Sequence, residues 1–226
     1  RGGASTVGPC VPIPLSGPAR KLAWVTEDSR LLIQDWLAGD TLALVTLPGM
    51  PAGQLAAADL GGGHGVGLFV GTRNGWIAGY DTTGTALPGF PKRPAAPALA
   101  GGPALGDLDG DGVLEIVCGS GNGIVRAWHA DGTVVTGFGV ETDGWAITSP
   151  VALSDLDGLP GVEIVVATAQ GDVYAFRGDG TLLWEGPVVV EPWPVAPVVA
   201  NRGGEPVVVV ASGTTLRTLG ADGTLR

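Results

Sequence analysis

An internal repeat is the feature of this sequence that most limits how the chain can fold. Three stretches align with a spacing of 48 residues and no gap (107 − 59 and 155 − 107). The matching positions are Asp59, Asp107 and Asp155; Gly75, Gly123 and Gly171; Tyr80, Trp128 and Phe176; and Gly84, Gly132 and Gly180. Repeated units of this length bury their apolar faces against their neighbours. We therefore expect a row of similar modules, with the three aromatic residues packed between adjacent modules.

Two further copies extend the repeat to the rest of the chain. Residues 197–224 form a shorter copy that ends, like the preceding one, in an Asp-Gly-Thr sequence. Residues 11–46 match that copy with an offset of 185, which places Pro12 on Pro197. The predicted modules are residues 11–46, 47–94, 95–142, 143–190 and 191–226, with residues 1–10 as a closing segment.

Each module has the pattern of several short strands. In the fourth module, residues 152–154, 162–167 and 172–177 are short apolar or alternating runs, and no stretch of the chain has a helical period. Asp131-Gly132, Asp179-Gly180 and Asp222-Gly223 predict tight hairpin turns. Four-stranded modules repeated radially are typical of a β-propeller. We therefore predict one all-β domain over residues 1–226, with five four-stranded blades.

The two ends of the chain suggest how such a ring would close. The last module stops at Arg226, soon after its Asp-Gly turn, and contains only the beginning of an outer strand. With the offset of 185, residues 4–10 are in phase to supply the missing strand. An open arc would leave strand edges unpaired. We expect the N-terminal and C-terminal strands to pair and close the ring.

Composition narrows the possible partners. The formal net charge is −10, so the phosphate backbone of a nucleic acid would be repelled. Every apolar run is too short to span a membrane as a helix. Cys10 and Cys118 fall in separate modules, so we expect no disulfide between them. The absence of an initiator Met and of a leader-like segment predicts a processed chain, or a part of a longer parent, and we expect a secreted or cell-surface location.

An acidic loop at residues 107–115 carries the clearest chemistry. Its acids stand at positions one, three, five and nine, and its glycines allow the chain to curl around a point. Calcium takes six to eight oxygen ligands, which alternate carboxylates and a backbone carbonyl can supply. The alternative is that the aspartates only form Asx turns. The predicted calcium ligands are Asp107, Asp109, Asp111, the carbonyl of Val113, and Glu115.

The acidic loop and the strand sequence that follows it resemble a known family. Residues 107–115, then Ile116 to Gly119 and Gly123 to Val125, are similar to the FG-GAP/VCBS repeat of integrin α-chain propellers and of many secreted bacterial proteins. The resemblance covers most of the chain and implies the same calcium ligands. Glu115 replaces the shorter Asp that is common at the ninth position, which alters the ligand geometry without abolishing binding.

The other copies of the loop are poorer in acids. A possible weaker site consists of Asp155, Asp157, the backbone of Gly161, and Glu163, because Leu159 occupies the fifth position. The copy that begins at Asp59 keeps only its first acid, and the copy at residues 201–205 is too short to surround an ion. His64 and His129 lack companions for a zinc site, so we interpret both as surface or turn residues.

Three functions are compatible with these features. The favoured hypothesis is a calcium-stabilised extracellular module that binds a protein or glycan. The second is a structural subunit that self-assembles, with Trp145 and Trp193 as contact residues, although we prefer to interpret both as staples that hold a blade. The third is a glycoside-active enzyme with paired carboxylates. Because no nucleophile-base set is evident, we expect no catalytic activity.

Overall fold

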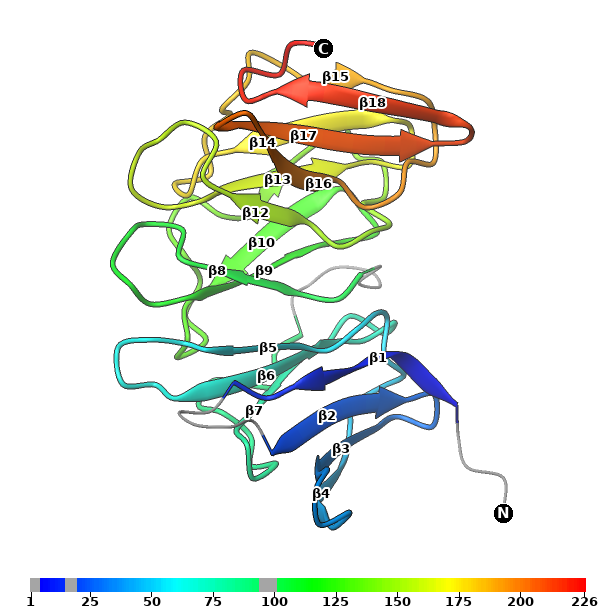
Figure 1. Cartoon of the computed structure of the whole chain (residues 1–226), viewed down its shortest axis with the longest axis vertical. Coiled ribbons are helices and arrows are strands. Elements are labelled where there is room, and N and C mark those ends of the chain that lie inside the picture. The colour runs from blue at the N-terminus through cyan, green and yellow to red at the C-terminus, as the bar shows by residue number, and fades with distance from the viewer. Residues whose placement is uncertain (1–4, 15–19, 94–100) are drawn as a thin grey trace.

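The computed structural model describes residues 5–14, 20–93 and 101–226, and within these ranges the chain forms strands and turns but no helix. Eighteen strands make five antiparallel sheets (Figure 1). The first sheet contains β1 (Thr6–Pro12), β2 (Lys21–Thr26), β3 (Arg30–Asp35) and β4 (Thr41–Thr46). The second contains β5 (Ala56–Asp59), β6 (Val66–Gly71) and β7 (Ile77–Tyr80).

The remaining three sheets repeat the same strand order along the chain. The third contains β8 (Ala104–Gly106), β9 (Glu115–Gly119), β10 (Ile124–Trp128) and β11 (Val140–Glu141). The fourth contains β12 (Ala152–Ser154), β13 (Glu163–Ala167), β14 (Asp172–Phe176) and β15 (Val188–Val189). The fifth contains β16 (Val198–Arg202), β17 (Glu205–Ser212) and β18 (Thr215–Gly220). The strands predicted in the fourth module are confirmed to within one residue.

The sheets follow one another in a propeller-like row. The first strand of each sheet contacts the first strand of the next, in the order β1, β5, β8, β12 and β16. Figure 1 shows this row from the side of these strands, with the first sheet at one end and the fifth at the other. The long loops β5–β6, β8–β9 and β12–β13 therefore lie along one side of the row. Because neighbouring strands are antiparallel, the β9–β10 and β13–β14 turns and the sheet-to-sheet connections lie on the opposite side.

An Asp-Gly turn positions the outer part of the third, fourth and fifth sheets. In the fourth sheet, the Thr181 amide and hydroxyl both donate to Asp179 Oδ1, at 2.9 and 2.7 Å. Gly180 has a φ of 84°, which a residue with a Cβ adopts only with strain. The turn leads to a single bridge between Phe176 and Leu182, after which the chain diverges before β15. The predicted tight turns are thus present and introduce a short outer segment.

Each pair of consecutive sheets encloses its own apolar core. The four clusters of buried residues lie between sheets one and two, two and three, three and four, and four and five. Tyr80, Trp128 and Phe176 are all buried in these interfaces. The prediction that the recurring aromatic residues pack adjacent modules together is therefore confirmed.

The predicted closure of the ring is wrong for this structure. Residues 1–4 of the proposed closing segment lie outside the described residues, but Thr6–Pro12 forms β1 and pairs with β2, from Thr6 opposite Thr26 to Pro12 opposite Leu22. Within the ranges that the structure covers, β1 does not pair with β18, and β18 is followed by only one bridge, between Leu219 and Leu225. The physical reason is that β2 needs a hydrogen-bonding partner on its inner edge, and the nearest segment in the chain provides it.

Candidate metal centre

The β8–β9 loop folds around the side chain of Asp107. Asp107 Oδ1 accepts hydrogen bonds from the amides of Gly110, at 2.7 Å, and Asp111, at 3.1 Å. Asp107 Oδ2 accepts another from the amide of Gly112, at 2.9 Å. Asp109 Oδ1 also accepts from the Asp111 amide two residues on, at 3.2 Å, which is the Asx turn that the sequence left as an alternative. These hydrogen bonds curl the loop so that its amides and acids face a common centre.

Three of the predicted ligands come together at that centre. Oxygen atoms of Asp107, Asp109 and Glu115 all lie within 4.8 Å of one another. Glu115, at the start of β9, is only 1% exposed, and its Oε2 accepts a 2.8 Å hydrogen bond from the Leu108 amide. Burial raises the pKa of Glu115, and the charge of Asp109 acts in the same direction. A buried carboxylate beside two other acids is a donor set that suits a hard divalent cation.

One of the predicted carboxylate ligands, Asp111, is not part of this group. Asp111 is exposed, and its Oδ1 accepts a 2.7 Å hydrogen bond from the Val113 amide instead. The group of mutually close acids therefore does not contain Asp111. The spacing of acids along the loop could not reveal this, because the rotamer of Asp111 is set by the local turn rather than by its sequence position.

His129 was missed as a member of this neighbourhood. Its Nδ1 lies 3.2 Å from Glu115 Oε1, and the ring is partly exposed. His129 follows β10 directly, so its proximity to the start of β9 depends on the antiparallel pairing of Trp128 with Ile116. His129 thus lies in a turn and is partly exposed, and in addition it contacts an acid of the loop. Among the described residues, the side chain of His64 forms no such ion pair with an acid.

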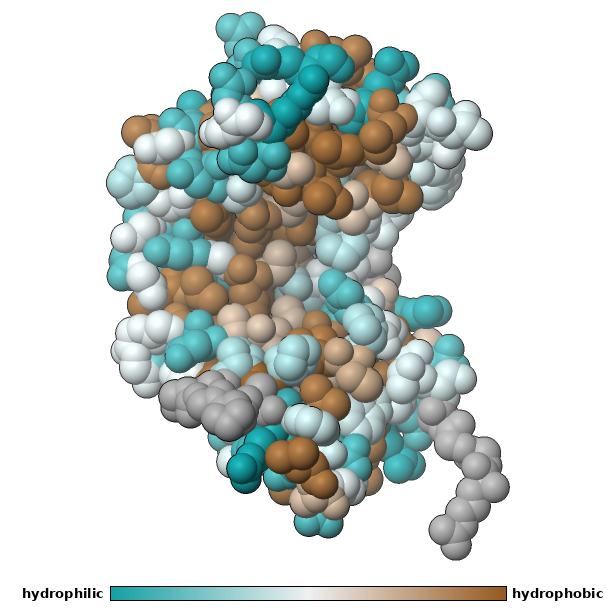
Figure 2. Space-filling model, in the orientation of Figure 1, coloured by the Kyte–Doolittle hydropathy of each residue, from teal (hydrophilic) through white to brown (hydrophobic). Residues whose placement is uncertain are grey.

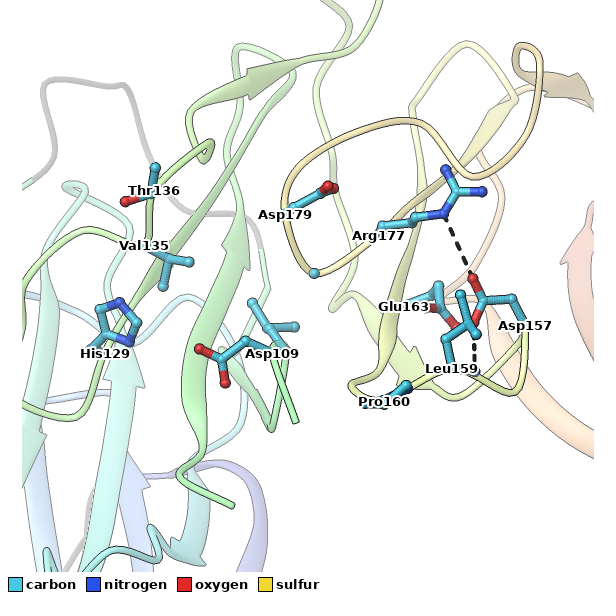
Figure 3. Close-up of a pocket in the computed structure, with 12 residues that line it drawn as sticks. Asp109, His129, Val135, Thr136, Asp157, Leu159, Pro160, Glu163, Arg177 and Asp179 are labelled. Atoms are coloured by element: carbon cyan, nitrogen blue, oxygen red, sulfur yellow. Dashed lines mark hydrogen bonds and ion pairs between the residues drawn. The ribbon is translucent and has the colours of Figure 1, made fainter. Parts of the chain in front are cut away.

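The second acidic loop, between β12 and β13, gathers the same three kinds of acid. Oxygen atoms of Asp155, Asp157 and Glu163 lie within 4.8 Å of one another, and Leu156 donates a 2.6 Å hydrogen bond to Glu163. A cationic side chain is already present here, because Arg177 Nε lies 3.6 Å from Asp157 Oδ2 (Figure 3). Leu159, at the fifth position of the loop, has no side-chain oxygen, and Gly161 can contribute only a backbone oxygen. This loop therefore fits a metal ion less well than the first.

Arg177 and His129 occupy equivalent places in consecutive repeats, since 177 − 129 is 48. Each follows the buried aromatic residue of its module and faces the acids of its own sheet. The 48-residue alignment contains this equivalence and could have pointed to a basic residue beside each acidic loop.

The loops of successive modules support one another. The Leu114 amide donates to the Leu60 carbonyl at 2.8 Å, and the Val162 amide donates to the Asp107 carbonyl at 2.9 Å. In the β5–β6 loop, Asp59 accepts from the Gly61 amide at 3.2 Å, and the described residues contain no group of three acids there.

A pocket of about 420 Å³ opens between the two acidic loops. Figure 3 shows Asp109, Val135 and His129 on one wall and Pro160, Glu163 and Arg177 on the other. The walls come from the third and fourth sheets, so the pocket depends on how the two blades pack. Charged groups of both signs line it, which suits a polar ligand.

The two tryptophans and the two cysteines singled out in the sequence lie in different environments. Trp145 is 53% exposed and Trp193 is 72% exposed, so a large part of each residue is open to solvent. Cys10 is exposed on β1, whereas Cys118 is buried on β9, and the two are not bonded. Burial raises the pKa of Cys118 to about 12. Within the part of the chain that the structure describes, no helix is long and apolar enough to cross a membrane.

Comparisons with known proteins bear on the fold. No family model and no curated protein matches the chain. Among solved structures, the V. cholerae biofilm matrix protein Bap1 is similar, with a TM-score of 0.68 and 18% identity over 98% of this chain and 38% of that chain. BBS1N in complex with ARL6DN is also similar. Its lead-soaked crystal gives a TM-score of 0.71 and 19% identity over 99% of this chain and 66% of that chain.

The mercury-soaked crystal of the same complex gives a TM-score of 0.70 and 20% identity over the same shares of the two chains. This chain thus spans between 38% and 66% of the length of the chains that it resembles. At these identities the likeness concerns the fold alone. Together with the five antiparallel sheets, it shows an all-β, propeller-like architecture.

Proposed function

We propose that this chain is a calcium-stabilised, extracellular binding module of the FG-GAP/VCBS type, with a protein or a glycan as its ligand and no catalytic activity of its own. The observation that carries the calcium part is the grouping of Asp107, Asp109 and buried Glu115. Bound calcium supplies positive charge that offsets the repulsion among these acids. The ligand positions of Asp111 and Val113 remain part of the proposal through the family resemblance.

The binding part is supported by the kind of protein that shares the fold. The similar structures include a biofilm matrix protein and BBS1N in complex with ARL6DN. The pocket between the third and fourth sheets lies next to the acids of the first loop, because Asp109 and His129 line it. Calcium at the first loop would therefore hold one wall of this pocket in place.

The calcium part is tested by thermal unfolding with and without calcium. Only the folded chain assembles the ligands, so calcium at 100-fold above its dissociation constant should stabilise by about 2.7 kcal/mol. Asp107→Asn should abolish this stabilisation. Asp59→Asn is the matched control, because Asp59 holds the same repeat position without companion acids. A parent chain whose melting temperature does not respond to calcium would contradict the proposal.

A second candidate function is that of a structural subunit. The observation in its favour is the exposure of Trp145 and Trp193, which are large apolar side chains at the surface. In that case, light scattering should show assemblies larger than a monomer, and replacing either tryptophan should reduce them. A monomer at every concentration would leave the binding module as the function.

The absence of catalysis is tested separately. The chain should turn over no substrate in a broad screen of glycosides and esters. Turnover that is lost in Asp143→Asn or Glu191→Gln would instead establish an enzyme with paired carboxylates.

A further inference from the structure

Two exposed tryptophans occupy one repeat position on the side of the molecule opposite the acidic loops. Trp145 lies in the connection from β11 to β12, and Trp193 lies in the connection from β15 to β16, 48 residues later. Trp193 has a φ of 59°, which is rare for a bulky side chain. More than half of the surface of each of these two residues is exposed, so both tryptophans are available for contact.

Backbone hydrogen bonds bring the two tryptophan segments together at one turn. The Ala169 amide donates to the Ala146 carbonyl at 2.8 Å, and the Trp193 amide donates to the Ala169 carbonyl at 2.9 Å. Ala169 belongs to the β13–β14 turn, which is closed by a 2.9 Å hydrogen bond from the Thr168 amide to the Asp172 carbonyl. The two tryptophans therefore flank the same turn, one from each neighbouring connection.

Carboxylates stand beside both tryptophans. The Trp145 amide donates to Asp143 Oδ1 at 3.2 Å, and Asp143 lies close enough to Asp172, at the start of β14, for the two carboxyl groups to interact. Glu191 is exposed two residues before Trp193, just as Asp143 is two residues before Trp145. An acid and a tryptophan thus recur together in consecutive repeats.

The Asp143–Asp172 pair carries more negative charge than its surroundings offset. Partial burial, followed by the interaction with the carboxyl group of Asp143, raises the pKa of Asp172 to about 6. Burial, followed by the charges of Asp143 and Asp172, raises the pKa of Tyr174 on the same strand. A positive group placed at this turn would therefore relieve repulsion that the folded chain contains.

We propose that Trp145, Trp193, Asp143, Asp172 and Glu191 form a docking surface for a lysine- or arginine-bearing segment of a partner protein. Ammonium and guanidinium groups bind the faces of exposed indoles, and carboxylates at the rim pair with them. The chain itself contains one such contact, with Arg93 5.9 Å from the ring centre of Trp76. The net charge of −10 favours approach of a cationic partner. This inference deepens the proposed binding function, but it does not depend on the acidic loops.

The surface is tested with a fluorescein-labelled peptide of alternating lysine and glycine, using fluorescence anisotropy. The matched peptide has glutamine in place of every lysine. The lysine peptide should bind, both in calcium and in EDTA, and more weakly at about 300 mM than at about 50 mM sodium chloride. Trp145→Ala, Trp193→Gly and Asp172→Asn should each weaken binding about two- to fivefold. Trp193→Gly relieves the unusual φ, so its effect is not a loss of folding.

Two control variants separate this surface from general effects. Trp36→Ala removes a tryptophan that is 54% exposed on the first sheet, and Asp179→Asn removes a carboxylate on the acidic-loop side. Both should bind the lysine peptide as the parent chain does. Circular dichroism melts establish that every variant is folded.

The proposal is overturned if the glutamine peptide binds equally well, or if the tryptophan variants bind the lysine peptide like the parent. It is also overturned if the tryptophan variants lose only binding to neutral oligosaccharides, which would make the surface a glycan site, or only self-association. Binding in EDTA keeps the two proposals separate: peptide binding without a calcium response would contradict the calcium loop alone, and the reverse result would contradict this surface alone.

Discussion

Arg177 determines how the second acidic loop is neutralised. Its guanidinium lies 3.6 Å from Asp157, and both side chains are partly exposed, so the ion pair contributes less than about 1 kcal/mol to stability. Arg177→Gln should therefore cost little stability while leaving Asp155, Asp157 and Glu163 without a cation. We expect this variant to bind one more calcium ion than the parent in titration calorimetry. Arg217→Gln on β18 is the control, and equal stoichiometry in parent and Arg177→Gln would contradict the role of Arg177.

Asp172 gives a prediction for the pH dependence of stability. Its pKa is about 6 in the folded chain, against an ordinary value of 3.8 for an aspartate. The folded state thus holds the proton more tightly, and this contribution to stability is present below pH 3.8 and lost as pH rises through 6. Asp172→Asn should raise the melting temperature relative to the parent, more at pH 7.5 than at pH 5. The charge that acts on Asp172 is that of Asp143, and at high pH Tyr174 on the same strand is a further titrating group.

Asp179 provides the comparison of opposite sign. The Thr181 hydroxyl and amide donate to it and lower its pKa, so its contribution is present above the unfolded pKa and lost as pH falls through the folded value. Asp179→Asn should therefore lower the melting temperature at pH 7 and have less effect near pH 3. The same direction of change for both variants at neutral pH would show that these hydrogen bonds do not set the pH profile.

At the level of the turn, Gly180 and Gly39 separate two costs of adding a Cβ. Both have positive φ, of 84° and 77°, so alanine is strained at each. A Cβ on Gly180 would lie only 2.5 Å from the Gly137 carbonyl oxygen, whereas nothing lies within 4 Å at Gly39. Gly39→Ala should cost about 1 kcal/mol, and Gly180→Ala should cost more because the backbone of the preceding blade must shift. If urea unfolding gives equal losses of unfolding free energy for the two variants, the backbone of the preceding blade shifts at little cost.

Strands and turns were the elements best predicted from the sequence, because their signals are local. The apolar runs of the fourth module correspond closely to β12, β13 and β14. The predicted Asp-Gly turns are also present. The partner of β1 could not be predicted in this way, since Val7 and Val11 would suit an edge of either terminal sheet, and long-range pairing decides between them. In the candidate site, the grouping of Asp107, Asp109 and Glu115 followed from spacing, but the contact of His129 with Glu115 required the register of β9 and β10.

On the scale of the whole molecule, stability comes from four separate interfaces. Ile164 is fully buried between the third and fourth sheets, and Ile164→Ala should cost about 2–5 kcal/mol. Leu216→Ala, at an exposed position on β18, should change stability by less than about 0.5 kcal/mol. Hydrogen exchange should show that Ile164→Ala loosens the third and fourth sheets more than β2 and β3, because repeats interact mainly with their neighbours. Uniform loss of protection along the chain would contradict this independence.

The row of sheets also has a mechanical consequence. The first and fifth sheets lie at opposite ends of the row, and β1 and β18 belong to these two sheets (Figure 1). The exposed apolar surface in the space-filling view spans several sheets (Figure 2). Among the described residues, however, each cluster of buried residues joins only two consecutive sheets. A pulling force applied between the two end sheets would therefore act on all four interfaces in series. Extension would proceed in steps, and the first step would occur at whichever interface ruptures at the lowest force.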